Sequence, residues 1–172
     1  MEAKKLRELL KYDPLTGNFF WRHSRSGVKD LTKPAGSYLQ QGYRRIGIEG
    51  SAYKAHRLAF LYMEGRVPAT VDHIDGDKSN NRWSNLREAS VVQNGANMKL
   101  PTNNTSGYKG VHWSKVEQAW QVRLQAEGVR HHLGYFTCKH RAAIAYNRAA
   151  ICYQKDYARL NHIQRREHAC QS

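Results

Sequence analysis

One short stretch of this chain combines residue types that could hydrolyse a phosphodiester bond. Asp72 and His73 end an apolar run, a turn containing Gly76 follows, and Asn85 and Asn94 come next. A carboxylate is the hard oxygen ligand that Mg²⁺ prefers, and a histidine beside it can take a proton from water. The order therefore predicts a single divalent-metal site in which His73 acts as a base and not as a ligand.

The charge of the chain indicates which phosphodiester this site would meet. Over 172 residues, 28 Lys and Arg side chains outnumber 14 Asp and Glu, which gives a net charge of +14. Residues 1–98 hold 16 basic against 10 acidic side chains (+6), and residues 99–172 hold 12 against 4 (+8). Such an excess favours nucleic acid, whereas no long apolar run or basic amphipathic anchor favours a membrane.

Apolar periodicity and turn residues predict the elements that must position the candidate site. We expect a helix around residues 6–10, strands over 19–21 and 43–48, a helix over 55–63 ending at Gly65, and a strand over 70–73. Residues 76–85 should form a loop, and a capping pattern at Ser90 predicts a helix that carries Asn94. Neighbouring strand residues point to opposite faces, so Asp72 and His73 need a bend near Gly76 to act differently.

The ordered series Asp72, His73, Asn85, Asn94 resembles the HNH nucleases, which have a ββα-metal fold. In that family two strands and a helix hold one cation. The resemblance implies that Asp72 and Asn94 bind Mg²⁺ or Mn²⁺ and that His73 is the general base. It also implies that Asn85 organises the loop and buttresses the histidine.

The resemblance covers roughly residues 6–98. The segment Tyr12-Asp13-Pro14-Leu15-Thr16-Gly17 and the segment Ala55–Ala59 are similar to phage homing-type members of the family, which use Asn as the last ligand. Asn97 remains an alternative to Asn94, because the phase of the helix is inferred. His56 stays ambiguous, with core packing beside Arg57 slightly favoured.

Four further polar residues of the motif, Asp75, Asp77, Asn80 and Asn81, are interpreted as loop-forming side chains. A calcium loop is excluded, because the bidentate Glu that it needs is replaced by Ser84. The three cysteines are too far apart for a CxxC pair, so no structural zinc is expected.

The second half of the chain predicts a separate small domain. Residues 99–106 are interpreted as a linker between domains at 1–98 and 107–162, and residues 163–172 as a basic tail. Strands are expected over 108–114, 119–126 and 129–136, with Glu127-Gly128 as a hairpin turn, and a helix over 142–151 with Thr137 as its N-cap. The predicted fold class is α+β: a ββα-metal nuclease domain, then a three-stranded antiparallel sheet packed on one helix.

This second segment closely resembles the Apetala/ethylene-response-factor (ERF) DNA-binding domain. The resemblance is carried by Gly110–Trp113, Trp120–Leu124, Leu133–Phe136, the helix 142–150 and Leu160-Asn161. It implies that the open face of the sheet binds double-stranded DNA in the major groove. The matching positions are Lys109, His112, Ser114, Arg123, Gln125, Arg130 and His132.

Strand alternation supports that face independently. Trp120, Val122 and Leu124 share the side that faces the helix, which leaves Arg123 and Gln125 on the exposed side. Arg and Gln can read base edges, and Lys can hold phosphates. His112, Ser114, Arg123 and His132 depart from the plant pattern, so its recognition sequence does not carry over.

Together these features predict a metal-dependent DNA endonuclease with a DNA-targeting domain, of phage or mobile-element origin. The N-terminus lacks an apolar signal region, so we expect an intracellular, cytoplasmic protein of a phage-infected host. No obligate protein partner is evident. The alternatives are a non-catalytic DNA-binding regulator and an RNA-processing nuclease.

Overall fold

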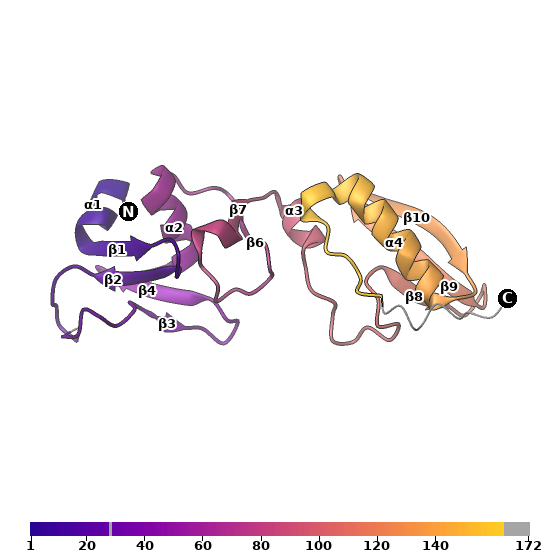
Figure 1. Cartoon of the computed structure of the whole chain (residues 1–172), viewed down its shortest axis with the longest axis horizontal. Helices are drawn as coiled ribbons and strands as arrows, with labels where there is room; N and C mark the ends of the chain where they lie inside the picture. The colour runs from indigo at the N-terminus through magenta and orange to yellow at the C-terminus, as the bar shows by residue number, and fades with distance from the viewer. Residues whose placement is uncertain (28, 164–172) are drawn as a thin grey trace. The chain divides into compact units, whose positions relative to one another are not determined.

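The computed structural model describes residues 1–27 and 29–163, so nearly all of the predicted basic tail lies outside the described residues (Figure 1). Contacts between Cα atoms divide the chain into two compact units, Met1–Ser90 and Val91–Ser172. Each has its own hydrophobic core, and each is described by itself.

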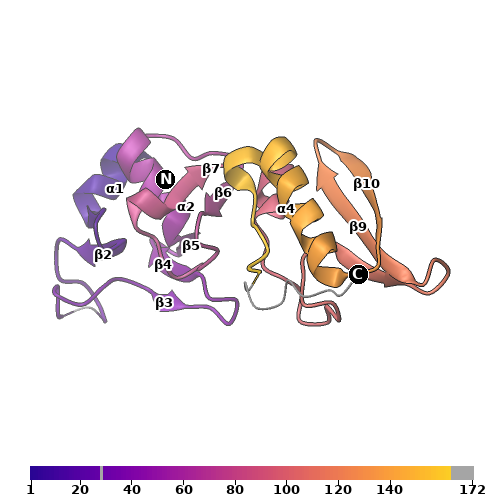
Figure 2. The same ribbon diagram turned by 45° about the vertical axis from the view of Figure 1, so that its right-hand side comes forward.

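The first unit is a mixture of helices and short antiparallel strands. Its elements are α1 (Ala3–Leu9), β1 (Leu10–Asp13), β2 (Asn18–Trp21), β3 (Ser37–Tyr38), β4 (Arg44–Ile48), β5 (Ser51–Lys54), α2 (Ala55–Glu64), β6 (Val71–His73), the 3₁₀ turn η1 (Trp83–Asn85) and β7 (Leu86–Glu88). The strands form three sheets, β1-β2, β3-β4-β5 and β6-β7 (Figure 2). The predicted helices and strands of this unit are confirmed, but β1, β3, β5 and β7 were missed.

The core of this unit follows from its apolar pattern. In β4 buried and exposed residues alternate, so that Ile46 and Ile48 enter the core beside Phe19 and Leu58. Helix α2 ends at Gly65 as predicted, because Gly65 adopts φ +75° and donates its N–H to the carbonyl of Leu61. This framework places β6 against the end of the core, with all three of its residues buried.

The second unit contains α3 (Val91–Ala96), β8 (Val111–Ser114), β9 (Ala119–Ala126), β10 (Val129–Phe136), α4 (Lys139–Gln154) and the 3₁₀ turn η2 (Lys155–Tyr157). Its sheet is antiparallel in the order β10-β9-β8, and α4 packs on it. The predicted bounds of β9 and β10 are confirmed. The predicted cap at Thr137 is wrong, because Cys138 is the N-cap of α4 and no side chain caps it.

Small residues let α4 lie close to the sheet. Ala142 and Ala143 are fully buried against the core that contains Val122. Gly110 adopts φ +73°, and a Cβ there would lie 2.2 Å from the ring of Tyr146. The β9–β10 turn is the predicted tight hairpin, with positive φ at both central residues.

Helix α3 groups with the second unit, whereas the sequence interpretation places residues 91–98 in the first domain. The Lys109 Nζ donates to the carbonyls of Ala96 and Met98 at the C-terminal end of this helix. A helix of six residues gains little stability by itself, so such a cap on its last carbonyls helps to hold it. No helix among the described residues is both long and apolar enough to cross a membrane.

Candidate active site

The β6–β7 ribbon brings Asp72 opposite Arg87 and His73 opposite Leu86. The carboxylate of Asp72 is 4 % exposed, and its Oδ2 accepts hydrogen bonds from Arg87 Nε at 2.9 Å and Nη2 at 2.7 Å. Burying a carboxylate is costly unless its charge is compensated, and the guanidinium of Arg87 contributes that compensation for Asp72. The sequence pattern does not predict this role of Arg87, because β7 is too short to give a strand signal.

The imidazole of His73 is also buried and is contacted on two sides. Its Nε2 lies 3.3 Å from Asn81 Oδ1. The ring of His56 meets it edge-on with centroids 5.0 Å apart, and the ring of Tyr43 lies 6.1 Å away. The histidine is therefore held in one orientation at the end of β6.

Asn85 organises the loop that follows β6. Its Nδ2 donates to Asp75 Oδ1 at 2.9 Å and to the carbonyl of Asn80 at 2.8 Å, and its Oδ1 accepts from the Asp75 N–H at 3.1 Å. These contacts close the segment that the sequence analysis predicted as a loop. The amide that meets the ring of His73 is that of Asn81, a residue interpreted only as loop-forming.

Burial keeps the histidines of this centre neutral. It lowers the pKa of His73, an effect that the hydrogen bond to Asn81 and the nearby carboxylates partly oppose. Burial, together with the charges of His73, Lys54 and Arg57, lowers the pKa of His56 to about 3. A neutral imidazole can accept a proton, as a general base requires.

His56, ambiguous in the sequence, lies on the first turn of α2 and is 6 % exposed. Its Nδ1 is a buried nitrogen without a hydrogen-bond partner among the described residues. The ring of Tyr43 lies 5.2 Å from that of His56, with Lys54 Nζ at 4.3 Å and Lys78 Nζ at 4.9 Å from the centroid of Tyr43. Two ammonium groups thus lie against the ring of Tyr43, which itself contacts both histidines, and they could attract a phosphate.

The oxygen and nitrogen atoms around Asp72 and His73 suit a hard cation only in part. The carboxylate of Asp72 and an amide oxygen are ligands that Mg²⁺ or Mn²⁺ accepts, with water completing the shell. Among residues 1–27 and 29–163, no group of three or more His, Cys, Asp and Glu side chains could hold a metal. Asn94, the second predicted ligand, lies in α3 and so belongs to the other unit.

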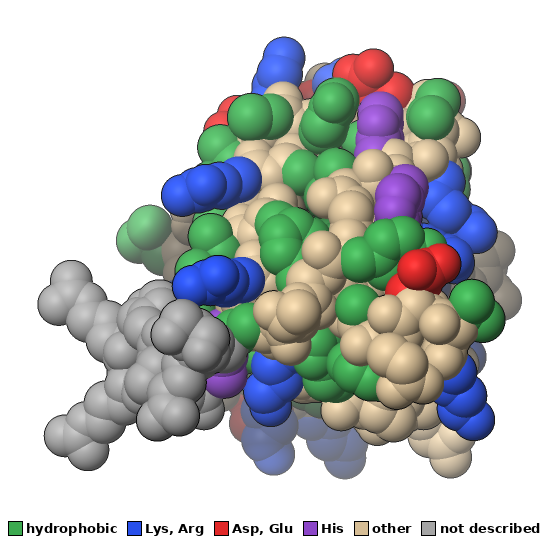
Figure 3. Space-filling model, turned by 90° about the vertical axis from the view of Figure 1, so that its right-hand side faces the viewer, with side chains coloured by type: hydrophobic (Ala, Val, Ile, Leu, Met, Phe, Trp, Pro, Cys, Tyr) green, Lys and Arg blue, Asp and Glu red, His purple; other side chains and the backbone are tan. Residues whose placement is uncertain are grey.

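The second unit collects most of the predicted DNA-binding residues on one face. The register pairs Arg130 with Gln125, His132 with Arg123, and His112 with Gln121. Their side chains share the side of the sheet opposite to buried Val122 and Leu124, as predicted. Figure 3 shows one face of this unit, on which Lys, Arg and His side chains outnumber acidic ones.

Three details of this face were not predicted from the sequence. A bulge between His132 and Gly134 interrupts the β9–β10 register, and Gln121 Nε2 donates to Tyr135 Oη at 3.0 Å beside it. Lys109 precedes β8, and its half-buried Nζ is directed to the carbonyls of α3. Ser114 ends β8 and is half-buried.

Comparisons with known proteins agree with the chemistry of the first unit. Residues 53–96 match the HNH endonuclease family. Protein 3.8 of Escherichia phage T7 is 47% identical over 84 residues, which are 46% of this chain and 69% of that protein. An uncharacterized HNH endonuclease of Acanthamoeba polyphaga mimivirus is 30% identical over 129 residues, 73% of this chain and 66% of that protein.

DNA endonuclease I-HmuI of Bacillus phage SP01 is 32% identical over 95 residues, which are 50% of this chain and 49% of that protein. No solved structure matches the chain. The matched family segment begins in β5, contains all of α2 and β6, and ends with α3, so it includes every residue predicted for the catalytic centre. Residues 53–96 thus carry an HNH endonuclease domain.

Proposed function

We propose that this protein is a divalent-metal-dependent DNA endonuclease. The observation that carries the proposal is the buried pair at the end of β6, in which a charge-compensated carboxylate adjoins a neutral, oriented imidazole. His73 is the general base that draws a proton from water. Asp72 and Asn94 are the metal ligands, and Asn85 shapes the loop between them.

A bound divalent cation would neutralise charge on the scissile phosphate and stabilise the leaving oxygen. The chain supplies the remaining functions. His73 accepts the proton of the attacking water, and the ammonium groups of Lys54 and Lys78 attract the phosphate backbone. Arg87 holds the carboxylate of Asp72 in place through its two hydrogen bonds.

The second unit is proposed to bind duplex DNA in the major groove, in the manner of the ERF domain that it resembles. Arg123, Gln125, Arg130 and His132 share an exposed face of a three-stranded sheet, and a two- or three-stranded surface of this size can enter the groove. His112 and Ser114 extend the same face along β8. A unit that holds DNA raises the effective concentration of the cleavage site.

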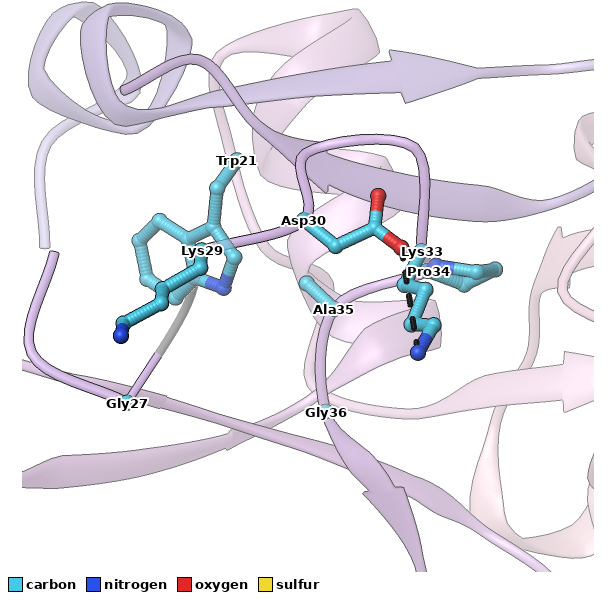
Figure 4. A pocket seen from close by; sticks show the side chains of 8 residues that line it. All are labelled: Trp21, Gly27, Lys29, Asp30, Lys33, Pro34, Ala35 and Gly36. Atoms are coloured by element: carbon cyan, nitrogen blue, oxygen red, sulfur yellow. Dashed lines mark ion pairs between the residues drawn. The ribbon is translucent and has the colours of Figure 1, made fainter. Parts of the chain in front are cut away.

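The segment 24–50 of the first unit is the alternative DNA-reading surface. It contributes to a cavity of about 440 Å³ in which Trp21 lies on one side and the Asp30–Lys33 ion pair, at 3.8 Å, on the other (Figure 4). Lys29 also lines it, and the guanidinium of Arg25 lies 4.1 Å from the centroid of Trp21. These basic groups support phosphate contact more than base readout.

Nicking of supercoiled plasmid with and without Mg²⁺ tests the proposed function. Cleavage that needs the cation and disappears in His73→Ala is the expected result. DNA binding without cleavage at any Mg²⁺ or Mn²⁺ concentration would favour the non-catalytic regulator. Matched duplex DNA and RNA, offered to the same preparation, decide whether the substrate is DNA or RNA.

A further inference from the structure

The β1–β2 turn has no role in the proposed chemistry, yet it is hydrogen-bonded to the loop that carries Asn81. The turn comprises Tyr12-Asp13-Pro14-Leu15-Thr16-Gly17. Tyr12 Oη donates to the carbonyl of Asn81 at 2.7 Å, although the two residues are 69 positions apart. The N–H of Trp83 donates to the carbonyl of Pro14 at 3.0 Å. The turn therefore holds this loop by hydrogen bonds on both sides of Arg82.

Gly17 brings the two backbones into close contact. It adopts φ +75°, and a Cβ at this position would lie 2.3 Å from the carbonyl carbon of Asn81 and 2.4 Å from the nitrogen of Arg82. Non-bonded atoms do not approach a Cβ this closely, so any side chain at position 17 must displace the loop. The turn itself is fixed by Asp13, whose side chain accepts from the Leu15 N–H at 3.0 Å and from Thr16 Oγ1 at 2.7 Å.

The loop in turn determines which way the Asn81 amide points. Asn81 is 2 % exposed, and its Nδ2 donates to the carbonyl of Ser79 at 3.0 Å. A carbonyl can only accept, so the NH₂ end of the amide must face Ser79 and Oδ1 must face His73. Because Oδ1 also only accepts, the Nε2 of His73 at 3.3 Å must carry the proton.

We propose that the β1–β2 turn positions the general base: Tyr12 and Gly17 fix Asn81, and Asn81 holds His73 as the tautomer protonated on Nε2. In this tautomer the lone pair lies on Nδ1, so Nδ1 is the ring nitrogen that can accept a proton. Asn81 is a positioning residue, and the turn acts through it. The catalytic consequence rests on the proposed function, whereas the tautomer does not.

Nitrogen-15 NMR of the full chain labelled on histidine, recorded without divalent metal, tests the inference directly. His73 is assigned by the signals that disappear in His73→Gln. The parent protein should show a protonated Nε2 and an unprotonated Nδ1, and Asn81→Leu should show a mixture of both tautomers. Asn81→Asp keeps an oxygen toward the ring and should restore the parent pattern.

Cleavage rates add a second measurement on the same variants. Asn81→Leu should lower kcat about tenfold or more with little change in KM for plasmid, because a misdirected base acts on the chemical step. Gly17→Ala should change kcat and tautomer in the same direction, and Tyr12→Phe less. Tyr146→Phe removes an equally buried hydroxyl from the other unit and should leave the His73 signals unchanged.

Two results overturn the inference, and neither depends on activity. They are a parent protein with the proton on Nδ1, and a folded Asn81→Leu variant with the parent tautomer. If instead the tautomer responds as expected but His73→Ala still cleaves DNA, the positioning stands and the assignment of the general base is what fails.

Discussion

In the first unit the residues proposed for chemistry are buried, whereas in the second unit most of those proposed for DNA binding are exposed. Asp72 and His73 are 4 % and 5 % exposed and contact Arg87 and Asn81. The exposed side of the sheet carries Arg123, Gln125, Arg130 and His132. Of these, His132 contacts the side chain of Gln121. The first arrangement fixes the orientation of a few groups. The second arrangement leaves positive charge accessible to a partner.

The difference indicates how each unit should respond to mutation. A buried hydrogen-bonded centre depends on each member, because removal of one partner leaves another unsatisfied. An exposed basic face tolerates single losses, because phosphate contacts add up and are screened by salt. Substitutions in the first unit should therefore affect rate and stability, and those in the second affinity and its dependence on salt.

The largest effect is expected at His73. His73→Ala should reduce plasmid nicking by about 10²–10⁴-fold, because a general base contributes that factor to the rate and little to binding of the substrate. DNA affinity, measured by fluorescence anisotropy in EDTA, should stay near that of the parent. A folded His73→Ala variant that retains more than about a tenth of the parent rate would show that another group is the base.

Asp72→Ala and Asn94→Ala test the two residues proposed as metal ligands. Each should raise the Mg²⁺ concentration for half-maximal cleavage by about tenfold or more, since both are proposed ligands of the same ion. Asp72→Ala should also lower the melting temperature, because it removes the ion pair of the half-buried Arg87 with Asp72. Asn97→Ala is the matched control. If it shifts the Mg²⁺ titration and Asn94→Ala does not, the ligand is Asn97.

Arg123 and Lys109 separate the two kinds of contact proposed for the second unit. Arg123→Ala should cost about 1–3 kcal/mol at one preferred base pair and relax specificity at that position. As a phosphate contact, the role predicted from the sequence, Lys109 would be needed for every DNA sequence, so Lys109→Ala would weaken binding to all of them alike. The structure changes that expectation, because Lys109 bonds to α3 and because burial and Arg159 lower its pKa to about 8.

Lys109→Ala should therefore reduce the stability of the second unit and leave the salt slope of the folded protein nearly unchanged. Urea unfolding followed by circular dichroism, together with binding at several salt concentrations, measures both quantities. A loss of about one unit of slope without loss of stability would restore Lys109 as a phosphate contact.

The last expected effect is the response of the first unit to acid, measured over the narrow range from pH 7 to pH 5. His56 has a folded-state pKa of about 3, below its ordinary value of 6.5, so the unfolded chain binds the proton more readily. Above pH 6.5 His56 does not change the free energy of unfolding with pH. As the pH falls from 6.5 toward 3, it lowers the free energy of unfolding by roughly 1.4 kcal/mol per pH unit. His56→Phe should flatten that dependence between pH 7 and 5, whereas His23→Phe, at an exposed site, should not.

The sequence by itself was sufficient for elements that depend on local pattern. Alternation along 119–126 and 129–136, with Glu127-Gly128 between them, predicts β9, β10 and the exposed side of the sheet. Gly65 ends α2 where a left-handed residue is needed. The ordered series Asp72, His73, Asn85 and Asn94 likewise carries the resemblance to the HNH family, because all four residues lie within one short segment.

Only the tertiary structure decided the partners of those groups. Arg87 reaches Asp72 through a strand pairing, Tyr12 reaches Asn81 across 69 residues, and Lys109 meets the end of α3. None of these contacts produces a periodicity or a spacing, because each depends on how separate segments are brought together by burial of the apolar core. Residue types therefore suffice to suggest the reaction, and long-range packing determines which side chains hold its base and its carboxylate in place.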